Sequence, residues 1–320
     1  MTVSVVIPAY NAAAFLSRAV DSVLAQTERV REVVVVNDGS TDGTAAVARS
    51  YGPAVRYLHQ SNAGVAAARN RGIHEVRGRW VAFLDADDEW YPWKNERQMA
   101  VLRAYPNLRW CACEGEVVRG TQRKANPLAR RARRVFHEHG FFPDYFAAAE
   151  LGVFLHTGGM LVDADTLRGA GGFDATLHGP EDADLWARLA LRNAAIGYVP
   201  EVCYRYYADV ENSLSKNGLR AHYMLMSMAK IADGLGEHPE RARTYRQFAQ
   251  RQAFRLLVAA AGGREEVSEA EVAEHLKRFP PTRIQSLILH ILPHLPGSLR
   301  GRLEGPIRDV HRSWHQQFGA

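Results

Sequence analysis

Apolar runs of strand length alternate with helical patterns through the first half of the chain. The predicted strands are residues 3–8, 33–36, 55–59 and 80–84. Helical patterns separate them at residues 15–24, 45–51 and 66–76. Asn11 has the position and chemistry of an N-cap for the first helix. This regular alternation predicts an α/β fold with a mainly parallel sheet covered by helices.

Polar residues gather immediately after each predicted strand. The clusters are Tyr10 with Asn11, residues 37–42, residues 60–62 and residues 85–88. In open α/β sheets, ligands bind at the carboxyl ends of the parallel strands. We therefore expect the four clusters to converge on one site.

The middle of the chain predicts further regular elements around one basic segment. A helix begins at Pro92, and a strand follows at residues 108–113. Residues 119–134 then contain seven basic residues and no acid, which indicates either a solvated, mobile loop or a loop that docks an acceptor or faces lipid. Later we expect a strand, a short helix, a helix beginning near Glu181 and a pair of strands ending around Tyr207.

After about residue 218 the pattern is helical only. We therefore divide the chain into an α/β domain over residues 1–218 and a helical C-terminal extension over residues 219–320. Within the extension, residues 286–303 place a leucine and isoleucine stripe beside two arginines. Such a stripe is either an interfacial membrane anchor or a surface for helix packing in a core or a homodimer.

Composition and charge limit the cellular location and the kinds of site that the protein can have. The formal net charge is +5, and the three cysteines form neither a zinc pattern nor a disulfide framework. No apolar run is long enough to span a bilayer, and no signal peptide precedes the first strand. We expect a cytoplasmic protein, in free form or peripheral on the inner face of the membrane. One basic run without interleaved aromatics does not favour a nucleic-acid partner.

Three aspartates crowd the end of the predicted strand at residues 80–84. Helix capping accounts for one carboxylate, but Asp85, Asp87 and Asp88 together repel one another unless a cation compensates. Oxygen ligands suit Mg²⁺ or Mn²⁺, and these ions usually share their coordination with substrate phosphates. The cluster therefore predicts a divalent-metal site.

The chain resembles the family 2 glycosyltransferases, which have the GT-A fold. The resemblance covers about residues 3–212. It rests on five segments in a fixed order: VVIPAYN (5–11), VNDGSTDGT (36–44), NAGVAAARNRGI (62–73), FLDADD (83–88) and GGFDATLHGPEDADLWARL (171–189). It implies a nucleoside-diphosphate sugar donor, with UDP favoured, a divalent cation, and transfer with inversion at the anomeric carbon.

Matching the motifs position by position implies roles for the donor-side residues. Pro8, Tyr10 and Asn11 would line the nucleoside pocket, and Asp38 would hydrogen-bond the base. Arg69 would orient the nucleotide or the aspartate cluster, unless it forms a purely structural ion pair. Asp85 and Asp87 correspond to the family's D-x-D motif, so Asp85 would contact the nucleotide sugar and Asp87 would hold the metal with help from Asp88.

Inversion also requires a general base on the acceptor side. Asp182 matches the family's proposed base, and Glu181 would orient it or bind the acceptor. On charge alone, the helix dipole explains acids at this helix start equally well. Gly159 would form the floor of the acceptor site, although a plain tight turn accounts for this glycine as well. Tyr207 stands where relatives often carry a histidine that reaches the metal.

These residues predict an inverting transferase that moves one sugar to a carbohydrate or lipid-linked acceptor hydroxyl, in bacterial cell-envelope or polysaccharide assembly. Single transfer is favoured because the Q-x-x-R-W element of processive synthases is absent. One alternative is a family member that binds sugar nucleotide without turnover. A sugar-phosphate nucleotidyltransferase is disfavoured, because no Gly-rich basic loop follows the first strand.

Overall fold

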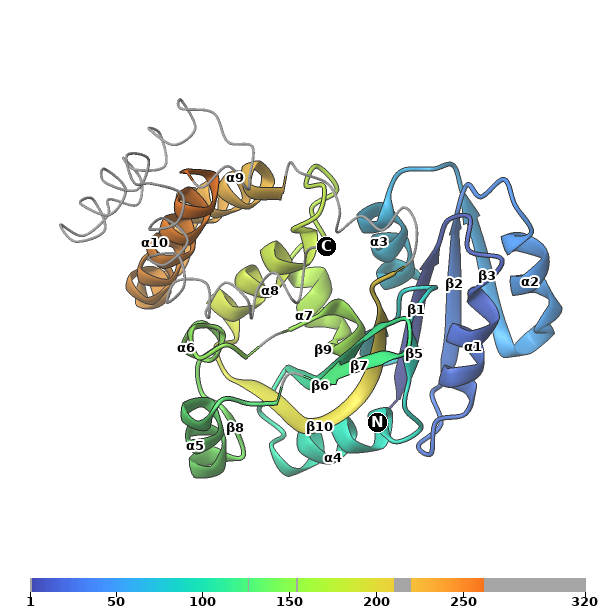
Figure 1. The fold of residues 1–320 in the computed structure, drawn as a ribbon, viewed down its shortest axis with the longest axis horizontal. Helices are drawn as coiled ribbons and strands as arrows, with labels where there is room; N and C mark the ends of the chain where they lie inside the picture. The colour runs from blue at the N-terminus through green and yellow to red at the C-terminus, as the bar shows by residue number, and fades with distance from the viewer. Residues whose placement is uncertain (1, 126, 154, 210–219, 262–320) are drawn as a thin grey trace. The chain divides into compact units, whose positions relative to one another are not determined.

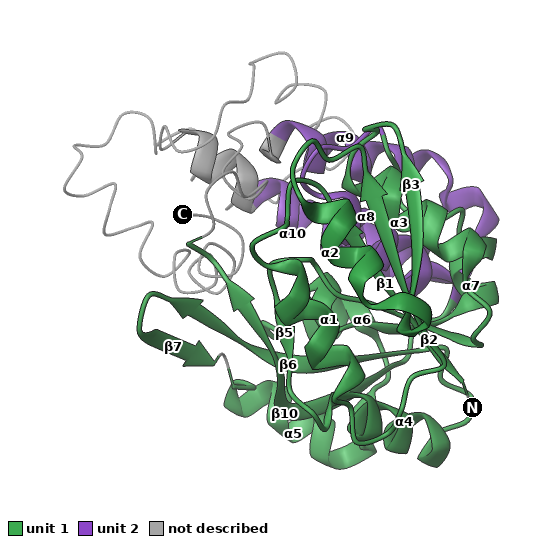
Figure 2. Ribbon diagram, turned by 90° about the vertical axis from the view of Figure 1, so that its right-hand side faces the viewer, with its two compact units in different colours: residues 1–175, 193–213 green, residues 176–192, 214–320 purple. Residues whose placement is uncertain are grey.

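The computed structural model describes residues 2–125, 127–153, 155–209 and 220–261 (Figure 1). Its internal contacts divide the chain into two compact units (Figure 2). Unit 1 contains residues 1–175 and 193–213, and unit 2 contains residues 176–192 and 214–320. The boundary predicted at residue 218 and the apolar stripe at 286–303 both lie outside the described residues.

The described strands of unit 1 form one ten-stranded sheet. They are β1 (Val3–Ala9), β2 (Glu32–Asp38), β3 (Val55–Gln60), β4 (Trp80–Phe83), β5 (Glu89–Trp90), β6 (Trp110–Arg119), β7 (Gln122–Ala125), β8 (Phe141–Phe142), β9 (Leu161–Asp163) and β10 (Ile196–Tyr207). The order is β3-β2-β1-β4-β9-β6-β10-β5, with β7 on β6 and β8 on β10. The first four strands are parallel, as predicted, and β9 runs antiparallel to both of its neighbours, so the sheet is mixed.

Helices cover both faces of the parallel strands. Those of unit 1 are α1 (Leu16–Leu24), α2 (Thr44–Ser50), α3 (Val65–Glu75), α4 (Lys94–Ala104), α5 (Arg130–His139), α6 (Tyr145–Glu150) and α7 (Ala164–Gly169). Every residue of β1 is buried. Val5 belongs to the same core cluster as Val20 of α1, whereas Val6 faces Gly72 of α3. Successive side chains of a strand point to opposite faces, so two helix layers explain why β1 carries buried apolar residues on both faces.

Asn11 is not the N-cap of the first helix, as its chemistry had suggested. Helix α1 begins at Leu16 after Phe15, and Asn11 has a left-handed backbone with φ +47°. Its N–H donates to Ser40 Oγ at 2.9 Å, and its Oδ1 accepts from the Thr41 N–H at 2.9 Å. The side chain therefore ties the turn after β1 to the loop after β2, in a conformation that Asn tolerates better than most residues.

The basic segment at residues 119–134 is not one continuous loop, as had been predicted. It contains the end of β6, the strand β7 that pairs back onto β6, and the first half of α5. The predicted pair of strands ending at Tyr207 is also wrong, because β10 is one strand. Its register against β6 shifts between Val199 and Val202, where Pro200 has no N–H to donate to the ladder.

Unit 2 is helical in its described part, as predicted for the extension. It contains α8 (Glu181–Arg192), α9 (Arg220–Asp233) and α10 (Pro239–Ala261). Ser227 Oγ of α9 donates to Asp184 Oδ1 of α8 at 2.7 Å, and Tyr245 of α10 donates to the Met228 carbonyl at 3.2 Å. In neither unit does a described helix have the length and apolar character that a membrane crossing requires.

Candidate active site

The polar clusters after β1, β2 and β3 lie at one edge of the sheet, as predicted. Asn11 bonds the loop after β2, as described above, and Asp38 at the end of β2 bonds the loop after β3. Asp38 Oδ1 accepts from Gln60 Nε2 at 2.7 Å and from the Ala63 N–H at 2.9 Å. Its Oδ2 accepts from the Gly64 N–H at 2.8 Å. Asp38 thus holds the loop that leads into α3.

The side chains at the end of β1 differ strongly in exposure. Pro8 is buried in the strand and pairs in register with Val36 of β2. Tyr10, two residues later, is 54% exposed, and Asn11 is exposed as well. An exposed aromatic ring at the carboxyl edge of a parallel sheet is suited to contact a planar ligand group.

Arg69 of α3 connects the helix to the aspartate cluster. The side chain is buried, and its Nη2 donates to Asp85 Oδ1 at 2.7 Å. The guanidinium carbon also lies 5.2 Å from the centroid of the Phe173 ring. Of the two roles proposed for Arg69, the structure therefore shows the contact with the aspartate cluster.

The aspartates form a tight turn between β4 and β5. The Asp88 N–H donates to the Asp85 carbonyl at 3.0 Å, and Asp88 is fully buried. Asp88 Oδ1 accepts from the Tyr207 N–H at 3.0 Å, whereas its buried Oδ2 has no hydrogen-bond partner among the described residues. Burial, and then the charges of Asp87 and Asp85, raise the pKa of Asp88 well above its usual value. A buried carboxylate oxygen without a partner is unstable unless a cation or proton reaches it.

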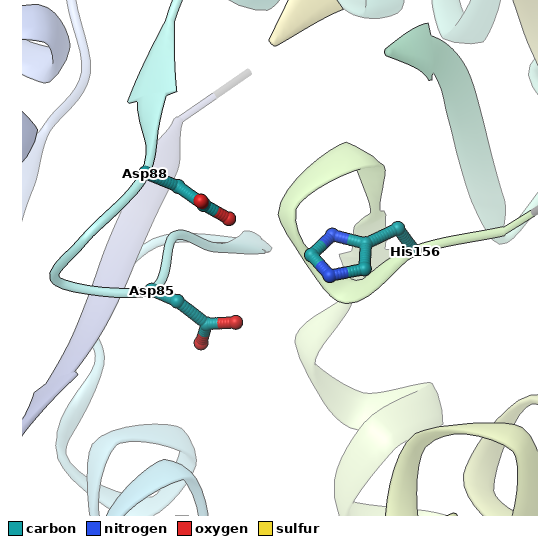
Figure 3. A group of neighbouring side chains, drawn as sticks. All are labelled: Asp85, Asp88 and His156. Carbon is teal, nitrogen blue, oxygen red and sulfur yellow. The ribbon is translucent and has the colours of Figure 1, made fainter. Parts of the chain in front are cut away.

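His156 lies opposite these carboxylates, although no sequence signal marked it as a metal ligand. Figure 3 shows Asp85 and Asp88 on one side and the imidazole facing them. One ligand atom from each of the three residues lies within 4.8 Å of the others. The ring stacks on Tyr204 with centroids 5.6 Å apart, and its Nδ1 accepts from the Gly158 N–H at 3.2 Å. Burial opposes ionisation of Asp85, but Arg69 and His156 outweigh it, so the pKa of Asp85 lies below its usual value.

This donor set can hold a metal ion. Two carboxylates suit Mg²⁺ or Mn²⁺, and an imidazole nitrogen favours Mn²⁺ over Mg²⁺, which strongly prefers oxygen. Asp87, the ligand expected from the motif, is not in this group of three. Burial and the charge of Asp85 raise the pKa of Asp87 to about 6.

Tyr207 supports the cluster by its main chain and its ring. Besides donating its N–H to Asp88, it donates its hydroxyl to Glu89 Oε2 at 2.9 Å. The Arg18 guanidinium lies 3.8 Å from the centroid of the Tyr207 ring and donates to the Asp87 carbonyl. Arg18 therefore brings a positive charge beside the aspartates, which the sequence motifs did not indicate.

The chain matches the family model described as Glycosyl transferase family 2 over residues 4–154. It is also 33% identical over 230 residues to an uncharacterized glycosyltransferase of Rickettsia prowazekii, covering 70% of this chain and 70% of the relative. The chain belongs to glycosyltransferase family 2. The chain spans 27% and 70% of the lengths of the first two curated relatives it matches.

Solved structures share the fold of this family 2 glycosyltransferase at low identity. Staphylococcus aureus TarS, in complex with UDP-GlcNAc, matches with a TM-score of 0.70 and 18% identity, over 99% of this chain and 92% of that one. A mannosyltransferase from Pyrobaculum calidifontis, in complex with GDP-Man and Mn²⁺, matches with a TM-score of 0.54 and 20% identity, over 90% and 78%. These likenesses confirm the mixed α/β sheet of GT-A type.

The residues predicted for the acceptor side come from both units. Gly159 is buried, and a Cβ there would lie 2.9 Å from Tyr204 Cε1, so this glycine is needed for packing against β10. Glu181 and Asp182 open α8 in unit 2, and both are buried. Glu181 Oε2 accepts from the Gly179 N–H at 3.2 Å, and Asp182 Oδ1 from the Ala183 N–H at 2.6 Å. Their catalytic roles stay predictions.

Proposed function

We propose that this family 2 glycosyltransferase transfers one sugar, with inversion, from a nucleoside-diphosphate sugar to an acceptor hydroxyl. UDP sugars are the favoured donors, and the acceptor is a carbohydrate or a lipid-linked glycan of cell-envelope or polysaccharide assembly. The observation that carries the proposal is the group of Asp85, Asp88 and His156 beside the carboxyl edge of the parallel strands. The carboxylate of Asp88 is fully buried and its Oδ2 has no hydrogen-bond partner among the described residues. A divalent cation that also binds the donor diphosphate would supply the missing positive partner.

The donor side of the proposal assigns binding to the sheet edge. Pro8, Tyr10 and Asn11 would line the nucleoside pocket, with the exposed Tyr10 ring against the base. Asp38 would hydrogen-bond the base with its remaining acceptor capacity, while its three present contacts hold the loop after β3. This arrangement makes donor binding depend on the order of that loop.

The chemical part of the proposal uses the acidic residues. Asp85, Asp88 and His156 would hold Mn²⁺ or Mg²⁺, with Asp87 nearby, and the ion would neutralise charge on the departing diphosphate. Arg69 would keep Asp85 ionised and oriented. Asp182 would accept the proton of the attacking hydroxyl as it forms the new glycosidic bond, and Glu181 and Gly159 would lie on the acceptor side.

A donor hydrolysis screen tests this function without knowledge of the acceptor. We expect slow, Mn²⁺-dependent release of nucleoside diphosphate from one sugar nucleotide in a panel of UDP, GDP and dTDP sugars. Asp182→Asn should bind that donor with unchanged affinity but lose transfer once an acceptor is found. Failure of every sugar nucleotide to be hydrolysed or to stabilise the protein would contradict the proposal. Binding without any turnover would instead support a non-catalytic family member.

A further inference from the structure

Helix α5 and strand β7 carry a surface that the donor chemistry does not use. Four arginines of α5 are exposed: Arg130, Arg131, Arg133 and Arg134. Arg123 and Lys124 of β7 are exposed as well, and only residues 126–129 separate the two elements. We call these six residues the basic face.

The arginines of the basic face are poorly compensated within the described part of the chain. Arg134 forms an ion pair with Glu138 at 3.1 Å, and Arg133 donates to the Leu128 carbonyl at 3.2 Å. Among the described residues, Arg123, Arg130 and Arg131 have no acidic partner within ion-pair distance. The first turn of α5 contains no acid, so Arg130 and Arg131 oppose the positive end of the helix dipole. Helix stability therefore does not explain their position.

Edge-strand protection and membrane insertion each account for only part of the basic face. Charged side chains often protect an edge strand, and β7 pairs with β6 alone, so protection could explain Arg123 and Lys124. It does not explain the arginines of α5. Insertion of α5 into a membrane would need a free apolar side. That side is already used, because Ala132 is fully buried and the Phe136 ring packs near Phe142, with centroids 5.9 Å apart.

We propose that the basic face docks an acceptor glycan that carries repeated carboxylates. The inference rests on the proposed transferase function and names its acceptor class. Guanidinium groups bind carboxylates and phosphates with paired hydrogen bonds, and successive arginines on one helix side offer several such contacts to one extended chain. A single small anion would not need arginines distributed over both a helix and a strand.

The test compares two triple variants that lose the same charge. R123Q/R130Q/R131Q removes the three uncompensated arginines, and R29Q/R31Q/R77Q removes three exposed arginines elsewhere in unit 1. Binding is measured to polygalacturonate, with uncharged dextran as the comparison, across a range of salt concentrations. Glutamine preserves helix propensity, and circular dichroism checks that each variant is folded.

We expect the native chain to bind polygalacturonate and not dextran, with an affinity that falls as salt rises. R123Q/R130Q/R131Q should weaken this binding by roughly tenfold, and R29Q/R31Q/R77Q by no more than about twofold. Equal weakening of polygalacturonate binding in both variants would show that net charge alone explains the binding, and would overturn the proposal. Binding of the same three proteins to phosphatidylglycerol vesicles is measured in parallel. If R123Q/R130Q/R131Q loses vesicle binding but keeps polygalacturonate binding, the basic face is a membrane surface and the proposal is overturned.

Donor hydrolysis without acceptor separates this inference from the proposed function. All three proteins should hydrolyse the donor at the same rate, because the basic face does not include the donor residues. A native chain that hydrolyses no donor would contradict the transferase function. The comparison between the two triple variants would still decide whether the basic face binds acidic glycans.

Discussion

Gly72→Ala tests whether the close approach of α3 to β1 is needed for stability. A Cβ at Gly72 would lie 2.3 Å from Val6 Cγ1 and 2.8 Å from Val6 Cγ2, well inside van der Waals contact. Val6 is fully buried, so neither side can yield without moving the helix or the strand. Overpacking of this kind costs about 1–3 kcal/mol. We expect the unfolding temperature to fall by about 2–4 °C for each kcal/mol lost.

A double-mutant cycle makes this prediction specific. In Val6→Ala the two methyl carbons disappear, and the nearest remaining atom to a Cβ at Gly72 is the Cβ of residue 6, at 3.1 Å. Val6→Ala alone should cost roughly 2 kcal/mol for lost burial and a small cavity. V6A/G72A should therefore be at least about 1 kcal/mol more stable than the sum of the single effects predicts.

Urea unfolding followed by circular dichroism measures all four proteins. Additive effects, or a G72A variant as stable as the native chain, would refute the reasoning that α3 is held against β1 by the missing side chain. Because Arg69 lies one turn before Gly72 on α3, G72A should also slow donor hydrolysis, whereas V6A/G72A should recover part of the rate.

Three further predictions concern the charged groups around the turn between β4 and β5. Arg205→Gln should destabilise unit 1 by roughly 1–3 kcal/mol, because Glu89 at 3.0 Å and Glu116 at 3.1 Å lose their partner; an unchanged urea midpoint would contradict this. Mn²⁺ should raise the unfolding temperature of the native chain but not of Asp88→Asn, and an equal shift would remove Asp88 from the metal group. Without added metal, stability should fall as the pH rises from about 4 through about 6, because folding raises the pKa of Asp87 to about 6 and the folded chain binds that proton more tightly. Asp87→Asn should flatten this dependence in a pH series of thermal unfolding.

The parallel part of the sheet could be predicted because its signal is local. Strands β1 and β2 contain uninterrupted apolar runs at residues 5–7 and 33–36, and helical patterns separate them from β3 and β4. The carboxyl ends of parallel strands share one edge, so Asn11, Asp38 and Asp85 could be expected near one site before any contact was known. The family resemblance added roles that periodicity alone does not supply.

Elements whose contacts override the preference of the local sequence were predicted less well. Asn11 resembles an N-cap in its local sequence, but contacts with Ser40 and Thr41 hold it in a left-handed turn instead. The charge run at 119–134 resembles a loop, but pairing with β6 makes part of it a strand. The partners of Asn11 lie about 30 residues away, whereas β7 forms a hairpin with the residues directly before it. In both cases the contacts outweigh the preference of the local sequence.

The sequence by itself determined the alternation of strands and helices, the crowding of carboxylates after β4, and the family that the chain resembles. Tertiary structure decided which atoms meet there. The His156 imidazole faces Asp85 and Asp88 across a long stretch of sequence, and Tyr207 holds Asp88 through its main-chain N–H rather than through a metal-binding side chain. Spacing along the chain does not encode such contacts, because they depend on how β9 and β10 add to the parallel strands and bring separate loops to one edge of the sheet.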